Sequence, residues 1–425
     1  MERFISLFGL IFLIFICYLI SEDRKHINWK LVITGVLMQF ALGILILKWS
    51  YGRFLFNQFS DLITTALSYT LDGTKFLFGN LLDTNSIGFI FALQVLPTII
   101  FVSALMAILY HIGIMEVVVS FIAKIMLKLL GTSGAESLAA AANIFVGQTE
   151  APLIIKPYLK EMTRSELLTV MVGGMASVSG GVLAGYIALG LDAGHLISAS
   201  LMSAPASLVI AKIIVPETDH PKTMGTVQTK LDAIDSNLID AASRGTSEGL
   251  GLAMNVGAML LSFTAIVALL NGSLSGLGHL INSGITGISH FFGTSSSGFA
   301  FLNHLSLETI LGTIFSPIAW IMGVPAQDMF IAGNLLGQKT ILNEFYAYSH
   351  LGEILKAGQI SERTTIILTY ALCGFANLAS IGIQVGGIGN LVPEKRPVIA
   401  ELGIKALIGG TVAAFMTATV AGILI

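Results

Sequence analysis

The chain contains little charge. Only 11% of its 425 residues are Asp, Glu, Lys or Arg, whereas 54% are hydrophobic and the mean hydropathy is +0.84. A soluble surface needs about a quarter charged residues, so this composition excludes an ordinary soluble protein and places the chain in a lipid bilayer. The net charge of -3 is small, and the sequence contains no block of basic residues. These two features exclude a nucleic-acid partner.

The sequence also lacks the patterns of metal and catalytic centres. Its two cysteines, Cys17 and Cys373, lie in separate apolar runs, which indicates small core residues rather than a disulfide or metal pair. No HxxxH or CxxC spacing occurs, so His111, His195 and His279 are expected to be packing or helix-end groups. Ser, His and Asp do not cluster either. We therefore expect no enzyme and no cofactor.

Long apolar runs are abundant. A membrane-spanning helix needs about 20 apolar residues, and eight runs meet or approach that length. The first lacks the basic start and small-residue cleavage site of a signal peptide, the alternative for that position. The eight predicted spans are Phe4 to Ile20, Leu31 to Leu47, Ser86 to Met115, Leu167 to Leu191, Ala193 to Ala211, Leu250 to Leu270, Thr364 to Leu391 and Leu402 to Ile425.

Basic residues between these spans predict the orientation, because cytoplasmic loops carry the excess of lysine and arginine. They place the loops after the first and third spans and before the last span inside, with the polar segment Glu217 to Glu248 on the same side. Both termini then face outside. The residues are Arg24, Lys25, Lys30, Lys124, Lys128, Lys395 and Arg396.

Two stretches break the pattern of spanning helices. Leu138 to Gly147 stops at Gln148, Thr149 and Glu150 and restarts at Leu153. Met329 to Leu336 breaks at Gly337 to Lys339 and continues to Glu344. Each is too short to cross, and non-helical backbone at membrane depth persists only where protein or a water-filled cavity satisfies it. We predict two re-entrant hairpins.

The hairpins belong to a predicted internal repeat. An interfacial amphipathic segment precedes each, Glu116 to Leu130 and Glu308 to Met322, and "GMASVSGG" from Gly174 matches "GFANLASIG" from Gly374 at an offset of 200 residues. Chance similarity between Gly- and Ala-rich segments is the alternative, but the order of elements recurs. One span separates the units, which predicts the inverted-topology repeat of secondary transporters.

The span after each hairpin is predicted to be discontinuous. Thr163 and Glu166 form a capping-box pattern, which predicts the start of the first of these helices. Leu167 to Leu191 carries six glycines around Ser177 and Ser179, and Thr364 to Leu391 carries five around Asn377 and Ser380. Glycine in a membrane helix is often a packing residue. Clusters with embedded Ser or Asn favour unwound backbone, whose carbonyls suit a sodium ion.

Glu150 and Glu344 are carboxylates in the predicted hairpins, and their presence in these apolar segments requires an explanation. A carboxylate inside a membrane is costly and indicates a functional site unless it lies at the interface or pairs with a cation, here Lys156 or Lys339. Together with Gln148, Thr149, Asn377 and Ser380 they describe a pocket rich in acceptors and without arginine. Such a pocket suits a neutral solute with several donors, such as a nucleoside, or a cation. Phe375 would cover a ring face or serve as packing.

Four separated segments resemble the signature segments of concentrative nucleoside transporters: "GQTEAPLIIKPYL", "GGMASVSGG", "LNEFYAY" and "GFANLASIGIQVGG". The resemblance implies a bacterial-type member, an all-α polytopic protein of the inner membrane that forms a homotrimer, each protomer with eight transmembrane helices and two re-entrant hairpins. It implies scaffold helices at 1–115, a first transport repeat at 116–215, a cytoplasmic connection at 216–249, a further scaffold helix and outer segment at 250–305, and a second transport repeat at 306–425.

The resemblance also implies a site for a uridine-like nucleoside and one for the coupling ion Na+. The nucleobase would face Gln148, Thr149, Glu150 and Val182. The ribose would contact Glu344, Phe375, Asn377 and Ser380. Sodium would lie among Asn143, Val146, Thr149, Ser177 and Val178, largely on backbone carbonyls.

Other functions stay open at this point. Glu150 could carry a proton in place of sodium coupling, and an elevator-type carrier of another small polar solute fits the same pattern. A cation channel fits less well because two dissimilar hairpin tips form no symmetric ring. A membrane-embedded enzyme would require chemical change of the solute.

Overall fold

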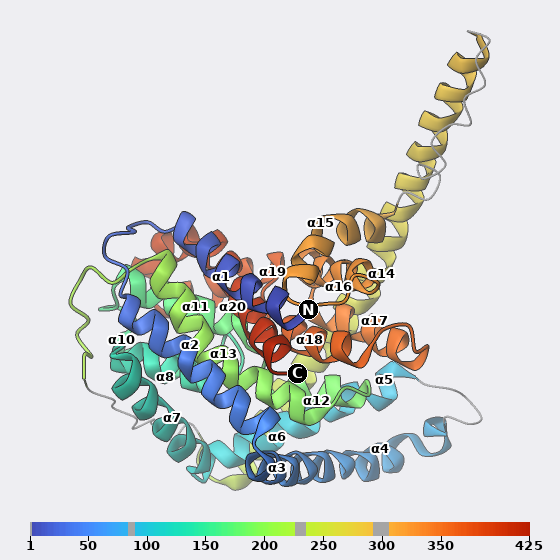
Figure 1. The fold of residues 1–425 in the computed structure, drawn as a ribbon. Coiled ribbons are helices and arrows are strands. Elements are labelled where there is room, and N and C mark those ends of the chain that lie inside the picture. Colours follow the sequence, from blue (N-terminus) through green and yellow to red (C-terminus); the bar gives the residue numbers. More distant parts are fainter. Residues whose placement is uncertain (1, 84–89, 226–234, 292–305) are drawn as a thin grey trace.

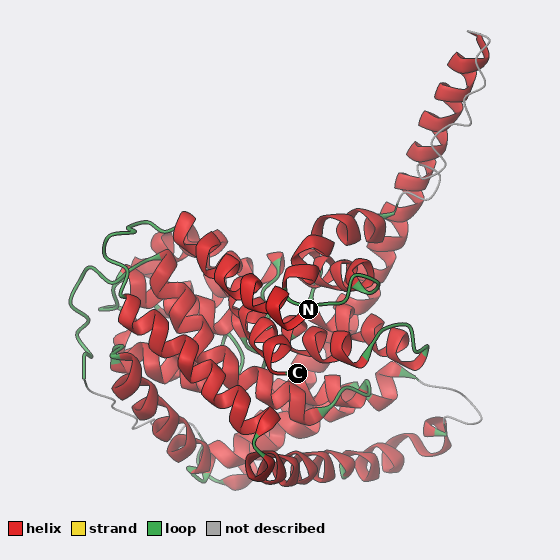
Figure 2. Ribbon diagram, in the orientation of Figure 1, coloured by secondary structure: helices red, strands yellow, loops and turns green. Residues whose placement is uncertain are grey.

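The computed structural model describes residues 2–83, 90–225, 235–291 and 306–425, which form helices joined by loops (Figure 2). These residues contain no strand, and one isolated bridge joins Ser133 to Met224. Seven described segments are long and apolar enough to cross a membrane. The expected all-α, polytopic fold class is confirmed.

An outer set of helices exposes large apolar side chains. It consists of α1 (Glu2–Leu19), α2 (Trp29–Gly43) with the π turn Ile44–Lys48, and α14 (Leu238–Phe291). Helices α5 (Phe91–Gln94) and α6 (Leu96–His111) have no exposed large apolar side chain, and α6 packs against α14. Phe4 of α1 and Leu261 of α14 are 78% and 75% exposed, as expected of side chains that face lipid. The third predicted span began at Ser86, which lies outside the described residues, and it ends at His111 rather than Met115.

Helix α14 is much longer than predicted. The sequence pattern indicated Leu250 to Leu270, but the helix continues over 54 residues and extends away from the helical body (Figure 1). Hydropathy marked only its apolar middle. No proline interrupts residues 238–291, so the polar flanks remain helical.

Two further helices, α3 (Ser50–Ser68) and α4 (Thr70–Phe78), follow the second span, and a 3-10 turn at Gly79–Leu82 follows them. No apolar run predicted an element here. Their apolar residues alternate with Arg53, Asp61 and Asp72, so the segment has no continuous apolar run. It is amphipathic rather than a membrane span.

The predicted order of elements occurs twice: a helix at the predicted interfacial segment, a hairpin, a broken helix and a plain helix. The first unit is α7 (Ile114–Leu130), α8 (Gly134–Ala142), α9 (Ala151–Ile154), α10 (Lys156–Leu159), α11 (Arg164–Ala176), α12 (Gly180–Ala188) and α13 (Ala193–Ile214). The second is α15 (Leu307–Ile321), α16 (Met329–Ile341), α17 (Glu344–Lys356), α18 (Glu362–Leu372), α19 (Leu378–Leu391), the 3-10 turn Pro393–Lys395 and α20 (Arg396–Leu424).

The register of the two units differs from the predicted one. Thr163 and Ser361 are the N-caps of α11 and α18, and Ser179 and Asn377 are the N-caps of α12 and α19. Both pairs are separated by 198 residues rather than 200. The predicted offset came from matching glycines in the two motifs, whereas the N-cap residues determine where each helix begins.

The most buried helices lie at the centre of the two units. Of the membrane-length windows, 89% of α11–α12, 94% of α13 and 78% of α20 is buried, compared with 28% of α1. Helices α11, α13 and α20 contact one another (Figure 1). The first broken helix, α11–α12, is therefore shielded from lipid by other helices, and its unpaired backbone groups can face protein or water.

Each hairpin is tied at its base to the start of the following broken helix. In the first unit, Glu166 closes the predicted capping box with Thr163 and also accepts a hydrogen bond from Ser133 Oγ. In the second, Asp328 Oδ2 accepts from Ser361 Oγ at 2.7 Å and from Thr364 Oγ1 at 2.6 Å. Burial favours the neutral acid, but these hydrogen bonds outweigh it and hold the pKa of the Asp328 carboxyl below its usual range.

The second hairpin turns later than predicted. The sequence indicated a break at Gly337 to Lys339, but α16 continues to Ile341 and α17 begins at Glu344. A Cβ at Gly337 would lie 2.6 Å from Leu311 Cβ, so this glycine permits close packing of α16 on α15 rather than a turn.

Candidate functional site

The two helix breaks meet at the centre of the protein. The first spans 177–179 and the second 373–377. The backbone N–H of Phe375 donates to the Ser177 carbonyl at 3.2 Å. Gly374 has φ +151°, and a Cβ there would approach the Met175 carbonyl oxygen to 2.8 Å, so a glycine is required. Unwound backbone from both units is thus placed side by side.

Two half-helices begin at these breaks. Ser179 Oγ accepts from the Val182 N–H at 3.4 Å, and Asn377 Oδ1 accepts from the Ser380 N–H at 3.0 Å. Helix N-termini carry partial positive charge. Since Val182 and Ser380 both line the same cavity, the starts of α12 and α19 border it.

The tip of the first hairpin lies against the first break. Gly180 N–H donates to the Phe145 carbonyl at 2.9 Å. On α11, a Cβ at Gly173 would lie 3.0 Å from Asn143 Nδ2, and one at Gly174 would lie 2.9 Å from Gln148 Cβ. These glycines act as close-packing positions, and they let the polar tip lie next to the helix.

A cavity of about 430 Å³ joins the hairpin tips, the breaks and α14. Its lining contains no lysine or arginine among the described residues. All eight residues predicted to contact substrate line it: Gln148, Thr149, Glu150, Val182, Glu344, Phe375, Asn377 and Ser380. The structure brings the set together, and its role in binding remains a prediction.

Glu344 connects three elements. Its Oε1 accepts from Tyr186 Oη of α12 at 3.2 Å, and its Oε2 accepts from Asn377 Nδ2 at 3.1 Å. Asn343 caps α17 by accepting the Tyr346 N–H at 2.7 Å. Each carboxylate oxygen keeps lone-pair capacity after these bonds, so Glu344 can accept further hydroxyl donors.

Gln148 lines the same cavity and is held by two side-chain hydrogen bonds. Its Nε2 donates to Ser380 Oγ at 3.0 Å, and its Oε1 accepts from Gln384 Nε2 at 3.2 Å. Gln384 also donates to the Met171 carbonyl at 3.0 Å. The first hairpin is therefore linked to α19, in the other unit, through side-chain amides.

Thr149 and Glu150 are exposed at the tip of the first hairpin. Among the described residues Glu150 forms no ion pair with Lys156, and Glu344 forms none with Lys339. The ion-pair alternatives considered for both glutamates are therefore not observed.

The predicted sodium residues surround the contact between hairpin and break. Asn143 is 2% exposed, and neither its Oδ1 nor its Nδ2 has a hydrogen-bond partner. Ser177 Oγ donates to the Gly173 carbonyl at 2.8 Å, which leaves its lone pairs free. Val178 is fully buried beside this break, and Val146 is half-buried. An unpaired buried amide is costly and fits a site whose ligand supplies the missing partner.

Several lining or supporting residues were not predicted. They are Tyr186, Asn255, Asn343, Gln384 and Lys339, on or next to α12, α14, α17, α19 and α16. Gln384 lies within the fourth signature segment, so its motif was the available signal. No comparable sequence signal marks Tyr186 or Asn255, because Tyr and Asn on apolar helices are usual packing and capping residues.

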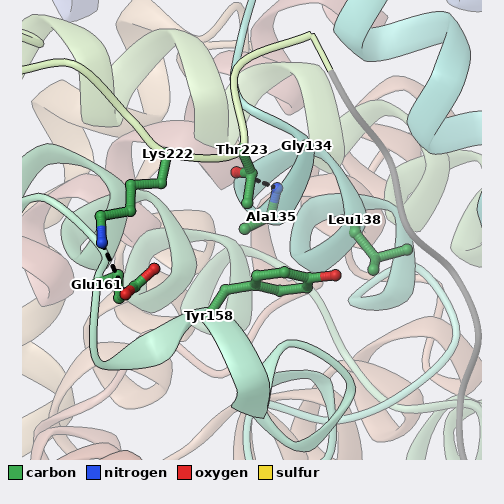
Figure 3. A pocket seen from close by; sticks show the side chains of 7 residues that line it. All are labelled: Gly134, Ala135, Leu138, Tyr158, Glu161, Lys222 and Thr223. Atoms are coloured by element: carbon green, nitrogen blue, oxygen red, sulfur yellow. Dashed lines mark hydrogen bonds and ion pairs between the residues drawn. The ribbon is translucent and has the colours of Figure 1, made fainter.

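A smaller hollow of about 280 Å³ lies at the base of the first hairpin (Figure 3). There the Gly134 and Ala135 N–H groups donate to the carbonyl and the hydroxyl of Thr223, and Lys222 pairs with Glu161 at 2.7 Å. The start of the predicted cytoplasmic connection thus binds the hairpin. Residues 226–234 of that connection lie outside the described residues.

Comparison with known proteins identifies the family. Three family models match: "Na+ dependent nucleoside transporter N-terminus" over residues 8–81, "Nucleoside recognition" over 92–192 and "Na+ dependent nucleoside transporter C-terminus" over 195–422. The uncharacterized transporter YutK of Bacillus subtilis is 45% identical over 422 residues, 99% of each chain. The nucleoside permease NupC of Helicobacter pylori is 43% identical over 428 residues, 99% of this chain and 97% of its own.

The fold has close solved counterparts. The structure of CNTnw in an inward-facing substrate-bound state is 44% identical, with a TM-score of 0.89 over 100% of this chain and 98% of that one. Variants of CNTnw in outward-facing and intermediate states give TM-scores of 0.89 and 0.90. The resemblance drawn from the four motifs is confirmed: the chain belongs to the concentrative, Na+-dependent nucleoside transporter family, as a bacterial member.

Proposed function

We propose that this protein is a symporter that imports nucleosides across the bacterial inner membrane, driven by the sodium gradient. The observation that carries the proposal is a single cavity lined by both hairpin tips and both helix breaks, next to the unpaired Asn143 amide. Discontinuous helices that meet near the middle of a repeat are the usual site of substrate and ion in secondary transporters.

We assign the residues that line the cavity to the two parts of a nucleoside. Gln148, Thr149, Glu150 and Val182 would contact the nucleobase, which offers amide-like donors and acceptors. Glu344, Asn377 and Ser380 would bind the ribose hydroxyls, with Phe375 against the sugar or base face. A carboxylate accepts two hydroxyl donors at once, so Glu344 is suited to a vicinal diol. Uridine is the solute we expect to bind.

Sodium would occupy the contact between the first hairpin and the first break. Asn143 Oδ1 would complete the oxygen ligands supplied by the backbone of Val146, Ser177 and Val178 and by Thr149. The ion would satisfy the Asn143 oxygen and draw hairpin and break together. Because Gln148 and Thr149 belong to the same hairpin tip, the ion would order the nucleobase end of the cavity, which couples the two ligands.

Proton coupling is the competing assignment. Glu150 is exposed to the cavity and has no ion-pair partner among the described residues, so it could bind a proton. The unpaired Asn143 favours sodium, since an amide oxygen coordinates a hard cation but does not titrate.

The two repeats would move together as a transport domain against a scaffold. We propose residues 116–215 and 306–425 as that domain, 1–115 and 250–305 as the scaffold and 216–249 as a cytoplasmic connection. The ties at both hairpin bases, and the Gln148 contacts to α19, support movement as one body. The second repeat would be inverted, and both termini would lie in the periplasm. The existence of inward-facing and outward-facing CNTnw structures supports alternating access by an elevator movement.

Uridine binding to the purified protein tests the proposal. Calorimetry in Na+ and in K+ at one pH should give tighter binding in Na+, and Glu344→Gln should weaken it in both salts. Equal affinity in Na+ and K+, with an affinity that follows pH, would assign coupling to protons instead. Absence of uridine binding under every condition would indicate another solute.

A further inference from the structure

Asn255 is a polar residue in the apolar part of α14 that the proposed binding of nucleoside and sodium does not use. It lies 17 residues after Leu238, the first residue of this helix, so it caps no helix end. Its amide has no hydrogen-bond partner among the described residues, whereas Asn271 of the same helix donates to Glu308 Oε1 at 3.1 Å and accepts from the Leu307 N–H at 2.8 Å. Capping and hydrogen bonding between helices, the usual structural roles of asparagine in a membrane helix, therefore do not account for Asn255.

The rotation of α14 about its axis is set by two glycines that pack against α6. A Cβ at Gly245 would lie 2.6 Å from Ala107 Cβ, and one at Gly249 would lie 2.7 Å from Ser103 Cβ. Larger residues at these two positions would separate the helices, which are in close contact. Asn255 follows Gly249 by six residues, which places it about a third of a turn away from this contact. Its side chain is exposed there and lines the cavity.

Neighbouring residues of α14 locate Asn255 between two parts of the cavity. Leu252 lies at the start of α12, since a Cβ at Gly181 would lie 3.7 Å from Leu252 Cδ2. Met259 lies at the tip of the second hairpin, where Asn343 Nδ2 is 3.9 Å from its sulfur. Along the helix axis, Asn255 is about 4.5 Å from Leu252 and about 6 Å from Met259. It therefore lies between the α12 side of the cavity, assigned to the nucleobase, and the second hairpin, assigned to the ribose.

Asn255 also differs from the other side-chain amides that line the cavity. Those of Gln148, Asn343 and Asn377 each have hydrogen-bond partners within the protein. Asn255 is thus the one lining amide without a partner among the described residues, and it keeps two donors and two acceptor lone pairs for a ligand. A planar amide can bind the edge of a nucleobase through one donor and one acceptor at once, as asparagine does with adenine. A ribose offers hydroxyls but no such flat edge.

We infer that Asn255 is a specificity-determining residue, which binds the hydrogen-bonding edge of the nucleobase through one donated and one accepted hydrogen bond. This inference rests on the proposed nucleoside transport. It gives α14, a helix outside the two repeats, a part in recognition of the solute. Rotation of the amide by half a turn exchanges its donor and its acceptor. Asn255 can therefore pair with a base that presents a carbonyl beside an N–H, or with one that presents an amino group beside a ring nitrogen.

Two ribosides and one variant test this role. Asn255→Leu removes both hydrogen bonds and keeps a side chain of similar size. The probes are uridine and phenyl riboside, whose ring has the same sugar but no hydrogen-bonding edge. Competition with labelled uridine on the purified protein in Na+ gives both affinities. The ratio of uridine affinity to phenyl riboside affinity should fall about tenfold in Asn255→Leu, because only uridine loses hydrogen bonds.

A second position on α14 provides the matched control. Thr264→Val removes a polar group from an exposed residue outside the cavity lining and should leave the ratio unchanged. If Asn255→Leu does not fold, Asn255→Ala should lower the ratio in the same way. An equal loss of affinity for both ribosides would make Asn255 part of the cavity wall only, and unchanged affinities would remove it from the site. Either result would overturn the inference and leave the proposed function in place, whereas failure of the unmodified protein to bind either riboside would refute both.

Discussion

At the scale of single residues, Glu344 gives the sharpest substrate prediction. Its oxygens are fixed by Tyr186 and Asn377, so a ribose with both hydroxyls can satisfy what remains of their acceptor capacity. A charged acceptor left partly unsatisfied in a dry site costs about 1–3 kcal/mol. Uridine should therefore compete better than 2'-deoxyuridine, and Glu344→Gln should reduce that preference. Competition assays with both nucleosides measure it, and equal competition in the unmodified protein would contradict the role.

Asn143 gives a sodium prediction with an internal control. Its side chain has no partner, whereas Asn334 on the second hairpin accepts from Gln338 Nε2 at 2.8 Å. Asn143→Leu should abolish the stimulation of uridine binding by sodium. Asn334→Leu should leave that stimulation in place, because the Asn334 amide is already satisfied within its own helix. Titration of each variant with NaCl at constant ionic strength is the measurement, and full sodium stimulation in Asn143→Leu would remove Asn143 from the ion site.

The site residues were predictable where a motif or a local rule marked them. The eight predicted substrate residues come together because polar groups in short apolar hairpins and broken helices must face protein or a water-filled cavity rather than lipid. Lys339 was considered only as an ion-pair partner, and Gln384 was quoted within a motif without a role. Tyr186 depends on how α12 packs on α17, a contact between distant parts of the chain that no local pattern reports.

At the scale of elements, the base of the first hairpin contains a buried ion pair that should stabilise the fold. Lys212 Nζ lies 2.8 Å from Glu136 Oε2, with side-chain exposures of 5% and 2%, and 3.0 Å from Glu217 Oε2. Removing one partner of a buried pair costs about 3–5 kcal/mol, because the other charge is left uncompensated. Lys212→Met should therefore lower the thermal unfolding midpoint of the detergent-solubilised protein markedly.

A nearby exposed pair provides the matched control for this variant. Lys222 pairs with Glu161 at 2.7 Å, but the side chains are 66% and 51% exposed. Exposed pairs contribute about 0–1 kcal/mol, so Lys222→Met should hardly change the midpoint. Similar midpoints for the two variants would show that the Lys212 cluster is not a stabilising element.

Elements were predictable where a cap or an apolar run defined them. The capping box at Thr163 and Glu166 was predicted and is present. The length of α14 and the helices α3 and α4 were missed, because hydropathy reports only the apolar part of a helix. The turn of the second hairpin was placed too early, because Gly337 serves packing against Leu311 rather than a change of direction.

At the scale of the whole molecule, the proposed trimer can be tested, and the exposed apolar side chains of α14 are candidates for its interface. Leu261 and Leu269 are 75% and 70% exposed on the helix that lines the cavity from the scaffold side. Lipid or neighbouring protomers can cover them. We expect native mass spectrometry of the protein released from gentle detergent to give three chains of 45.0 kDa each. A monomer under those conditions would contradict the proposed trimer.

Uptake of uridine by proteoliposomes tests both the energy source and the solute of the proposed transport. Labelled uridine should accumulate against its gradient when Na+ is present outside only, and should not accumulate with equal Na+ on both sides or with a pH gradient alone. Glu150→Gln should lose most of this accumulation because its carboxylate borders the nucleobase end of the cavity. Accumulation that does not depend on the sodium gradient and follows the pH gradient would contradict sodium coupling.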